Sequence, residues 1–285
     1  MNEFAKIEMD GYPEHLAGIT CQKIAQYSVG LLREHRTIGS GTLVAVGNRR
    51  GILTAHHVAD ILTEAPGIDI GINYQSVPHD FHVSAGDWHL VTIGTPSDLP
   101  SRLKEEKYTR CGPDLAFIWI TNDNDLTALQ KEKTVYPLEE NRFQEYCDIN
   151  PMRLIASGAP GQMKQQWGEY GTPSHRLQST HFLAQTLRTE VVEHKGFDLW
   201  QMATFNGQFD YPSNYKGISG GGLWLPVLAG DPEIGVPSIA LHDVVLVGTV
   251  FFQIFGTPHM WLVAHGPASI YGNGTLEKIR GFVPL

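Results

Sequence analysis

Short runs of β-branched and aromatic residues recur along the whole chain, and most of them end at Gly, Pro, Asn or Asp. Clear examples are GTLVAV, GILTA, LAFIWI, DVVLVGTVFF and WLVAHG. Turn signals such as GNRRG and GTPSDLP separate these runs. This rhythm is typical of short strands joined by tight turns, and not of strands that alternate with helices. It predicts an all-β chain folded as barrels or as a sandwich.

Two short helices interrupt this pattern. One follows HHV, around residues 59–63, and the other lies in the C-terminal tail. There Leu276, Ile279 and Phe282 recur at helical spacing, with Thr275 as the candidate cap. The stretches 101–110 and 129–146 are rich in charge and predict solvated connections, the second of them between two β units.

Composition narrows the function classes. The 285 residues are 42% hydrophobic, enough for a packed core, and the net charge of −9 argues against nucleic acid as the main ligand. No apolar run approaches the ~20 residues that cross a bilayer. The N-terminal residues do not follow the pattern of a secretory signal. Three widely spaced cysteines predict no disulfide framework and fit a reducing, cytoplasmic location; they are Cys21, Cys111 and Cys147.

Three segments follow one another in the order His, Asp, Ser. TAHHV holds His56 and His57, GPDLAFIWI places Asp114 at the head of an apolar strand, and YKGISGGGLW places Ser219 in a glycine-rich turn. A serine hydroxyl is a weak nucleophile that needs an adjacent base, and histidine titrates in the right range to be that base. A buried carboxylate then fixes the imidazole tautomer and stabilises the imidazolium.

The glycines around the serine have a chemical use as well. Backbone N–H groups must face the oxyanion that develops during acyl transfer. Gly217 stands two residues before Ser219 and can adopt the backbone conformation that turns its N–H inward. The N–H of Ser219 is the second candidate donor.

Together these segments resemble the trypsin/chymotrypsin-like serine peptidases, in their disulfide-free bacterial branch. TAHHV resembles the TAAHC or TNAHV box, DLAFI the D-[IL]-A-L-[IL] strand, and GISGGG the G-D-S-G-G-P turn. In that register His57 is the base, and His56 stands where the family has an alanine or asparagine directly before the catalytic histidine. The likeness extends from about Ile19 to the C-terminal helix.

The resemblance implies two antiparallel six-stranded β-barrels with a C-terminal helix. The expected parts are an N-terminal extension (1–17), a first barrel (18–125), a linker (126–149), a second barrel (150–268), and a C-terminal helix and tail (269–285). It further implies a serine endopeptidase that acts through His57, Asp114 and Ser219 and an acyl-enzyme, without metal or cofactor. The expected partners are a protein or peptide substrate and a regulatory protein.

Two departures from the family concern activation and specificity. Ile218 stands where secreted members carry an aspartate, so an ion pair with a newly cut N-terminus is not expected. The oxyanion turn must then be preformed or be ordered by a partner. By the family register the specificity pocket would be formed by Ser213, Phe251, Phe252 and Gln253, which predicts a preference for uncharged P1 residues.

Three other functions compete with this one. GISGG also matches the nucleophile elbow of α/β-hydrolases, in which Asp243 and His259 or His265 would complete the triad. An inactive peptidase fold that serves as a binding module or scaffold is the second. The third is a metal site, for which the candidate ligands are His56, His57 and Asp60, or His79, Asp80 and His82.

Overall fold

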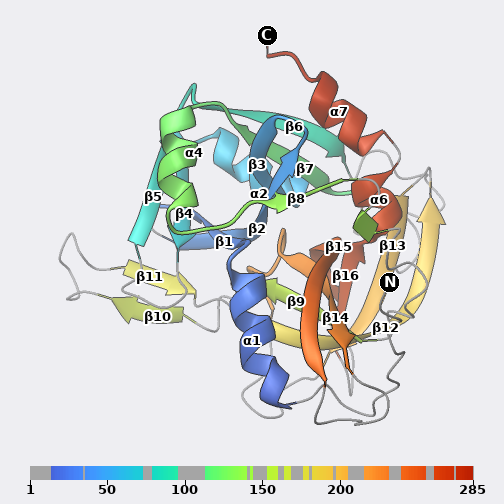
Figure 1. Ribbon diagram of the computed structural model, residues 1–285. Coiled ribbons are helices and arrows are strands. Elements are labelled where there is room, and N and C mark those ends of the chain that lie inside the picture. Colours follow the sequence, from blue (N-terminus) through green and yellow to red (C-terminus); the bar gives the residue numbers. More distant parts are fainter. Residues whose placement is uncertain are drawn as a thin grey trace.

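The computed structural model describes residues 14–34, 36–72, 79–95, 113–139, 142–143, 153–159, 164–167, 176–179, 182–194, 197–204, 215–230, 239–254, 260–272 and 274–284. Two antiparallel β units lie one above the other, and the N-terminal half of the chain forms the upper one in Figure 1. The predicted all-β architecture with a C-terminal helix is confirmed. None of the helices in the described residues is long and apolar enough to cross a membrane.

The first unit is a curved sheet. Its main strands are β1 (Ser28–Arg33), β2 (Arg36–Val46), β3 (Arg49–Thr54), β4 (Gly67–Ile72), β5 (His79–Ser84), β6 (Trp88–Gly94) and β7 (Leu115–Ile120). They follow the order β5-β4-β1-β2-β3-β7-β6, which makes a half-barrel and not the closed barrel that the sequence predicted. Strand β2 is also joined by three elements from later in the chain, β8 (Tyr136–Pro137) directly and the hairpin of β10 (Lys164–Trp167) and β11 (Arg176–Ser179) through β11.

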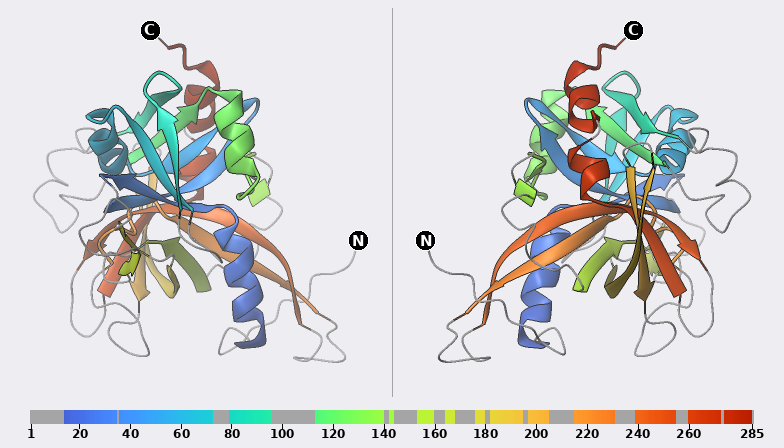
Figure 2. Two further views of the ribbon diagram at one scale, coloured as in Figure 1. Left: turned by 90° about the vertical axis from the view of Figure 1, so that its left-hand side faces the viewer. Right: turned by 90° about the vertical axis from the view of Figure 1, so that its right-hand side faces the viewer.

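The second unit is a closed barrel. Its strands are β9 (Arg153–Gly158), β12 (Phe182–His194), β13 (Phe197–Thr204), β14 (Gly222–Ala229), β15 (Ala240–Ile254) and β16 (Met260–His265). They close in the order β12-β13-β16-β15-β14-β9, as the resemblance implied. Seen from the side, the long strands of this barrel spread away from the first unit (Figure 2).

Five helices are described: α1 (Glu14–Ala25), α2 (His56–Thr63), α4 (Asp123–Gln130), α6 (Pro267–Tyr271) and α7 (Thr275–Gly281). The sequence pattern missed α1. Its last residues, Lys23 to Ala25, belong to the run KIAQYSVGLL, which has the composition of a strand. The buried positions of α1 recur every four residues at Leu16, Thr20 and Ile24, but the polar Thr20 interrupts the apolar stripe. The pattern also missed α4, which Asn122 caps by accepting from the N–H groups of Asn124 and Asp125.

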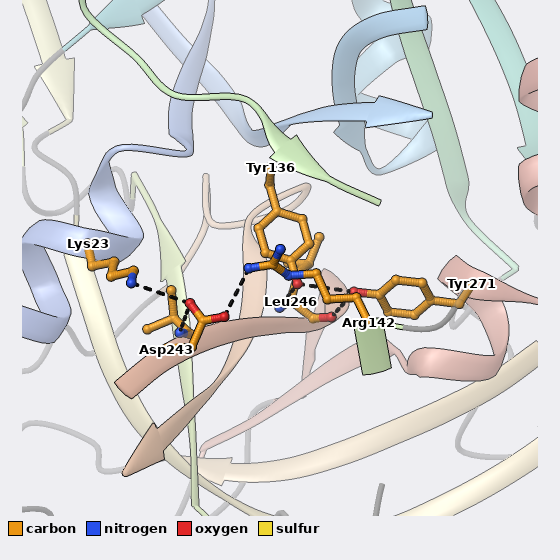
Figure 3. Close-up of polar contacts among 7 residues, drawn as sticks. Lys23, Tyr136, Arg142, Asp243, Leu246 and Tyr271 are labelled. Carbon is orange, nitrogen blue, oxygen red and sulfur yellow. Dashed lines mark hydrogen bonds and ion pairs between the residues drawn. The ribbon is translucent and has the colours of Figure 1, made fainter. Parts of the chain in front are cut away.

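The charged stretch 129–146 is not the solvated connection that we expected. Tyr136 and Leu138 are fully buried where the two units meet. The hydroxyl of Tyr136 accepts from the N–H of Leu246 at 3.2 Å, and Arg142 Nη2 donates to Asp243 Oδ2 at 2.9 Å (Figure 3). Asp243 also pairs with Lys23 of α1 at 3.4 Å, so a single carboxylate ties the linker and the first helix to β15.

The C-terminal helices pack across both units. Gly274, and not Thr275, is the N-cap of α7, and the Thr275 hydroxyl instead donates to the Ser269 carbonyl at 2.7 Å. At the other end of α7, Arg49 donates to the carbonyl of Phe282 at 2.6 Å while its guanidinium lies over the ring of Trp119. The last helix is therefore anchored to the first sheet.

The link between the two units can be tested at Tyr271. Its buried hydroxyl donates to the carbonyl of Leu246 at 2.7 Å and contacts the hydroxyl of Tyr136. Tyr271→Phe removes this hydrogen bond from a buried carbonyl, and we expect it to lower the free energy of unfolding by about 1–2 kcal/mol in urea denaturation. Tyr27→Phe is the matched control, because the Tyr27 hydroxyl makes no hydrogen bond within the described residues and that change should cost much less. Equal losses in the two variants would contradict the prediction.

Candidate active site

His57 and Asp114 meet because of the register between β3 and β7. Thr54 pairs with Ala116 in this antiparallel ladder, so the residues just beyond Thr54 lie opposite those just before Ala116. Asp114 Oδ2 lies 2.5 Å from His57 Nδ1, and Oδ1 accepts from the backbone N–H of His57 at 2.9 Å. The carboxylate therefore caps the start of α2 and orients the imidazole at the same time.

This contact decides which ring nitrogen of His57 is basic. A carboxylate accepts hydrogen bonds, so the network assigns the proton of the neutral ring to Nδ1 and leaves a lone pair on Nε2. The Asp114 side chain is 7% exposed, whereas that of His57 is 45% exposed. Burial alone would raise the pKa of Asp114, but the hydrogen bonds from His57 and its charge outweigh burial and lower that pKa. Asp114 is thus held as the anion.

His265 forms a hydrogen bond with the main chain of Asp114, a role that the sequence did not suggest. Its Nε2 accepts from the backbone N–H of Asp114 at 2.9 Å, and its ring stacks on Phe251 with 4.5 Å between centroids. Complete burial lowers the pKa of His265 to about 4, against the opposing charge of Asp114. The ring is therefore neutral near pH 7. Its Nδ1 is buried and has no partner within the described part of the chain.

Ser219 comes from the second unit and lies beside the start of α2. The backbone N–H of Ser40 donates to the carbonyl of Ser219 at 2.7 Å. A Cβ on Gly39 would lie 3.1 Å from that carbonyl and would collide with Val58, the residue after His57. Only glycine at position 39 therefore allows the serine turn and the helix that begins beside His57 to approach this closely.

The Ser219 hydroxyl donates to the carbonyl of Phe251 at 3.3 Å. Among the described residues it makes no hydrogen bond with His57. In the described residues the two predicted catalytic groups are therefore not joined by a hydrogen bond. Rotation of the Ser219 side chain about its Cα–Cβ bond is the movement that would redirect the hydroxyl.

Gly217 lies in a tight turn directly before Ser219. The N–H of Ile218 donates to the carbonyl of Tyr215 at 2.9 Å, and Gly217 has a φ of 101°. A positive φ at the third residue is what a type II β-turn requires, and glycine adopts it without strain. The backbone N–H groups of Gly217 and Ser219 have no acceptor within the described residues. Both donors are therefore available to a ligand.

Of the residues predicted to form the specificity pocket, three are described and Ser213 lies outside the described residues. The Phe251 side chain is buried in the core against His265, so its main chain is the part that reaches Ser219. Phe252 is partly buried. Gln253 Oε1 accepts from the N–H of Tyr215 at 2.8 Å and so contacts the start of the glycine turn. His56 is half-buried.

The geometry does not favour the rival sites. Ser219 is followed by strand β14 in an antiparallel barrel and Asp243 pairs with Lys23 and Arg142, so a hydrolase elbow does not fit. His82 pairs with Asp69 at 2.7 Å. No group of three or more His, Cys, Asp or Glu residues in the described part of the chain is arranged to hold a metal ion.

Of the comparisons with known proteins, the one with solved structures gives matches. Neither protein families nor curated protein sequences give a match. Neuropsin, a serine protease expressed in the limbic system of mouse brain, is 16% identical with a TM-score of 0.42 over 86% of this chain and 90% of that chain. Human heparin binding protein is 12% identical with a TM-score of 0.45 over 90% and 91%. The serine protease domain of the Sesbania mosaic virus polyprotein is 15% identical with a TM-score of 0.39 over 85% and 88%.

The described strands themselves define the fold, an open antiparallel sheet followed by a closed six-stranded barrel. Two of these three structures are named as serine proteases and the third is named for binding heparin. At identities between 12 and 16% and TM-scores between 0.39 and 0.45, these similarities assign no activity to this chain.

The buried imidazole of His265 makes stability depend on pH. The unfolded chain takes up a proton near pH 6.5 and the folded chain only near pH 4, so the free energy of unfolding should fall as the pH drops through this window. The expected loss is at most about 3 kcal/mol. The depressed pKa of Asp114 adds its own loss only at lower pH. His265→Gln should flatten the dependence between pH 6.5 and pH 4 in chemical denaturation, and an unchanged slope would contradict the assignment.

Proposed function

We propose that this protein is a serine endopeptidase that cleaves protein or peptide substrates through Ser219, His57 and Asp114. The observation that carries the proposal is the orientation of His57 by the Asp114 carboxylate, together with a serine turn in which two backbone N–H groups have no acceptor among the described residues. Each feature has a separate use in the proposed acyl transfer.

In the proposed reaction His57 Nε2 takes the hydroxyl proton as Ser219 Oγ attacks the scissile carbonyl carbon. The oxyanion that forms accepts hydrogen bonds from the N–H groups of Gly217 and Ser219. When the C–N bond breaks, the imidazolium gives its proton to the leaving amine and an acyl-enzyme remains. Water, deprotonated by the same nitrogen, then releases the acid and restores Ser219. Asp114 stays ionised and stabilises the imidazolium throughout.

The second candidate is a binding module built on the same fold. One observation favours it: the Ser219 hydroxyl bonds to the carbonyl of Phe251 and not to His57. A serine held there permanently would be a poor nucleophile. In unliganded sites, however, catalytic hydrogen bonds are often long and tighten only around the substrate, so the peptidase is the better-supported function.

Substitution of the three residues separates the two functions. Ser219→Ala and His57→Ala should each lower peptidase turnover by on the order of 10⁶-fold, because such residues act as a unit. His56→Ala is the matched control and should cost far less, since His56 is not joined to Asp114. The measurement is hydrolysis of a peptide library together with labelling of Ser219 by a diphenyl phosphonate. A wild-type chain that neither cleaves nor reacts would be a binding module. Equal damage from both histidine changes would move the base to His56.

We further propose that the P1 pocket prefers uncharged, small-to-medium residues. Ser213 has no carboxylate to pair with a basic side chain, and the partly buried ring of Phe252 makes the neighbouring strand apolar. Cleavage after such residues should exceed cleavage after Lys or Arg by at least ~10-fold, as pocket contacts of ~1–3 kcal/mol produce. The measurement is the identity of the P1 residue at each cleavage site in a peptide library. Dominant cleavage after Lys or Arg would contradict this proposal and point to Asp210 as the pocket residue.

Three expectations about biological setting stay predictions. They are a cytoplasmic location, a restricted set of protein substrates and a regulatory protein partner. The small number of cysteines supports the first, because it suits a reducing compartment. The other two follow from the first, since an unrestricted peptidase would damage the proteins around it.

A further inference from the structure

We propose that Ser40 is a positioning residue that holds the oxyanion turn in its formed state from the opposite β unit. The inference rests on the proposed peptidase function and identifies what replaces the ion pair that is lost with Ile218. Ser40 lies on strand β2 of the first sheet, whereas the turn belongs to the second unit. It is fully buried between them.

Every polar group of Ser40 is used. Its backbone N–H donates to the carbonyl of Ser219 at 2.7 Å, and its hydroxyl donates to the carbonyl of Gly217 at 2.8 Å. The same hydroxyl accepts from the N–H of Ala159 at 2.9 Å, and its carbonyl accepts from the Thr54 hydroxyl at 2.7 Å. One residue thus connects β3, β9 and the turn.

These bonds fix three consecutive peptide groups of the turn. The peptide after Gly217 is held at both ends, by the Ser40 hydroxyl on its carbonyl and by the Tyr215 carbonyl on its N–H. The carbonyl of Ile218 accepts from Gly221 at 2.8 Å. The peptide after Ser219 is held by the N–H of Ser40 and, through Gly220, by the carbonyl of Val250.

With these peptides fixed, the N–H groups of Gly217 and Ser219 have no acceptor in the described part of the chain. They are the two groups that the oxyanion needs. Of the groups that hold these three peptides, the Ser40 hydroxyl is a side chain, so a substitution can remove it while the main chain stays intact. Its loss would free the carbonyl of Gly217 and let the preceding peptide rotate.

The backbone of the turn packs closely against Ser40 and its neighbours. A Cβ on Gly220 would collide with the Ser40 carbonyl and the Thr54 hydroxyl, and a Cβ on Gly158 would lie 2.6 Å from Ile218 Cγ1. Ile218 itself is 2% exposed and packs in the core of the second barrel. Apolar burial and the Ser40 hydrogen bonds together therefore do what an ion pair at position 218 would do, and the turn needs no partner to form it.

The test compares Ser40→Ala with Thr42→Val. Thr42 lies two residues further along β2, is fully buried, and its hydroxyl has no partner among the described residues, so the change to valine keeps its size and removes nothing from the turn. The probe is a peptidyl diphenyl phosphonate, which forms a bond from Ser219 Oγ to phosphorus and releases phenol, with His57 relaying the proton. The first-order inactivation constant and the inhibition constant KI are measured separately.

Ser40→Ala should lower the inactivation constant by roughly 10- to 100-fold and leave KI within about twofold, because it displaces donors that act on the transition state only. Thr42→Val should match the wild type in both constants. Ser40→Cys, which keeps a weak donor of similar size, should fall between and serves if Ser40→Ala does not fold.

The possible results are separable. Labelling of Ser40→Ala at the wild-type rate would overturn this inference and leave the peptidase function standing. The same holds if KI rises as much as the inactivation constant falls, or if Thr42→Val is equally slow, since these indicate general loosening of the site. A wild-type chain that never reacts would overturn the proposed function and the inference with it.

Discussion

The site depends on the contact between strand β2 and the serine turn. His57 and Asp114 belong to the first sheet and Ser219 to the second barrel, so no single sheet fixes their separation. The hydrogen bonds from Ser40 to the carbonyls of Gly217 and Ser219 run from the first sheet to the second barrel and fix this separation. Gly39, beside Ser40, allows this approach because a side chain there would collide with Val58. The requirement for close contact thus explains the small residues at the start of GSGTLVAV.

The charge of the site is arranged around one carboxylate. Asp114 receives both the backbone N–H and the Nδ1 of His57, which keeps it ionised although it is buried. Its own N–H is satisfied by His265, a ring that is neutral because it is fully buried. A neutral acceptor at this position satisfies the main chain without introducing a second charge next to the carboxylate. In the proposed reaction the negative charge therefore remains available to the imidazolium of His57.

The sequence predicted the fold class and the neighbouring positions of His57 and Asp114 because short strand patterns and local motifs carry that information. It did not predict α1, whose buried stripe includes Thr20, or the burial of Tyr136 in a stretch that is charged on average. The supporting residues Ser40 and His265 were also missed. Their roles depend on partners more than 100 residues away in the chain, and a hydroxyl or imidazole within a strand has no pattern that names such a partner.

The groups that hold the serine turn also determine whether a change of pH can alter its conformation. The groups that fix the turn are the Ser40 hydroxyl, main-chain amides and the buried side chain of Ile218, and none of them titrates in the range in which the fold is stable. An ion pair at position 218 would have tied the shape of the oxyanion site to the ionisation of its partners. Here the groups that hold the turn carry no charge, so in the proposed peptidase a change of pH acts on the Asp114 carboxylate and on the buried His265 and not on the turn itself.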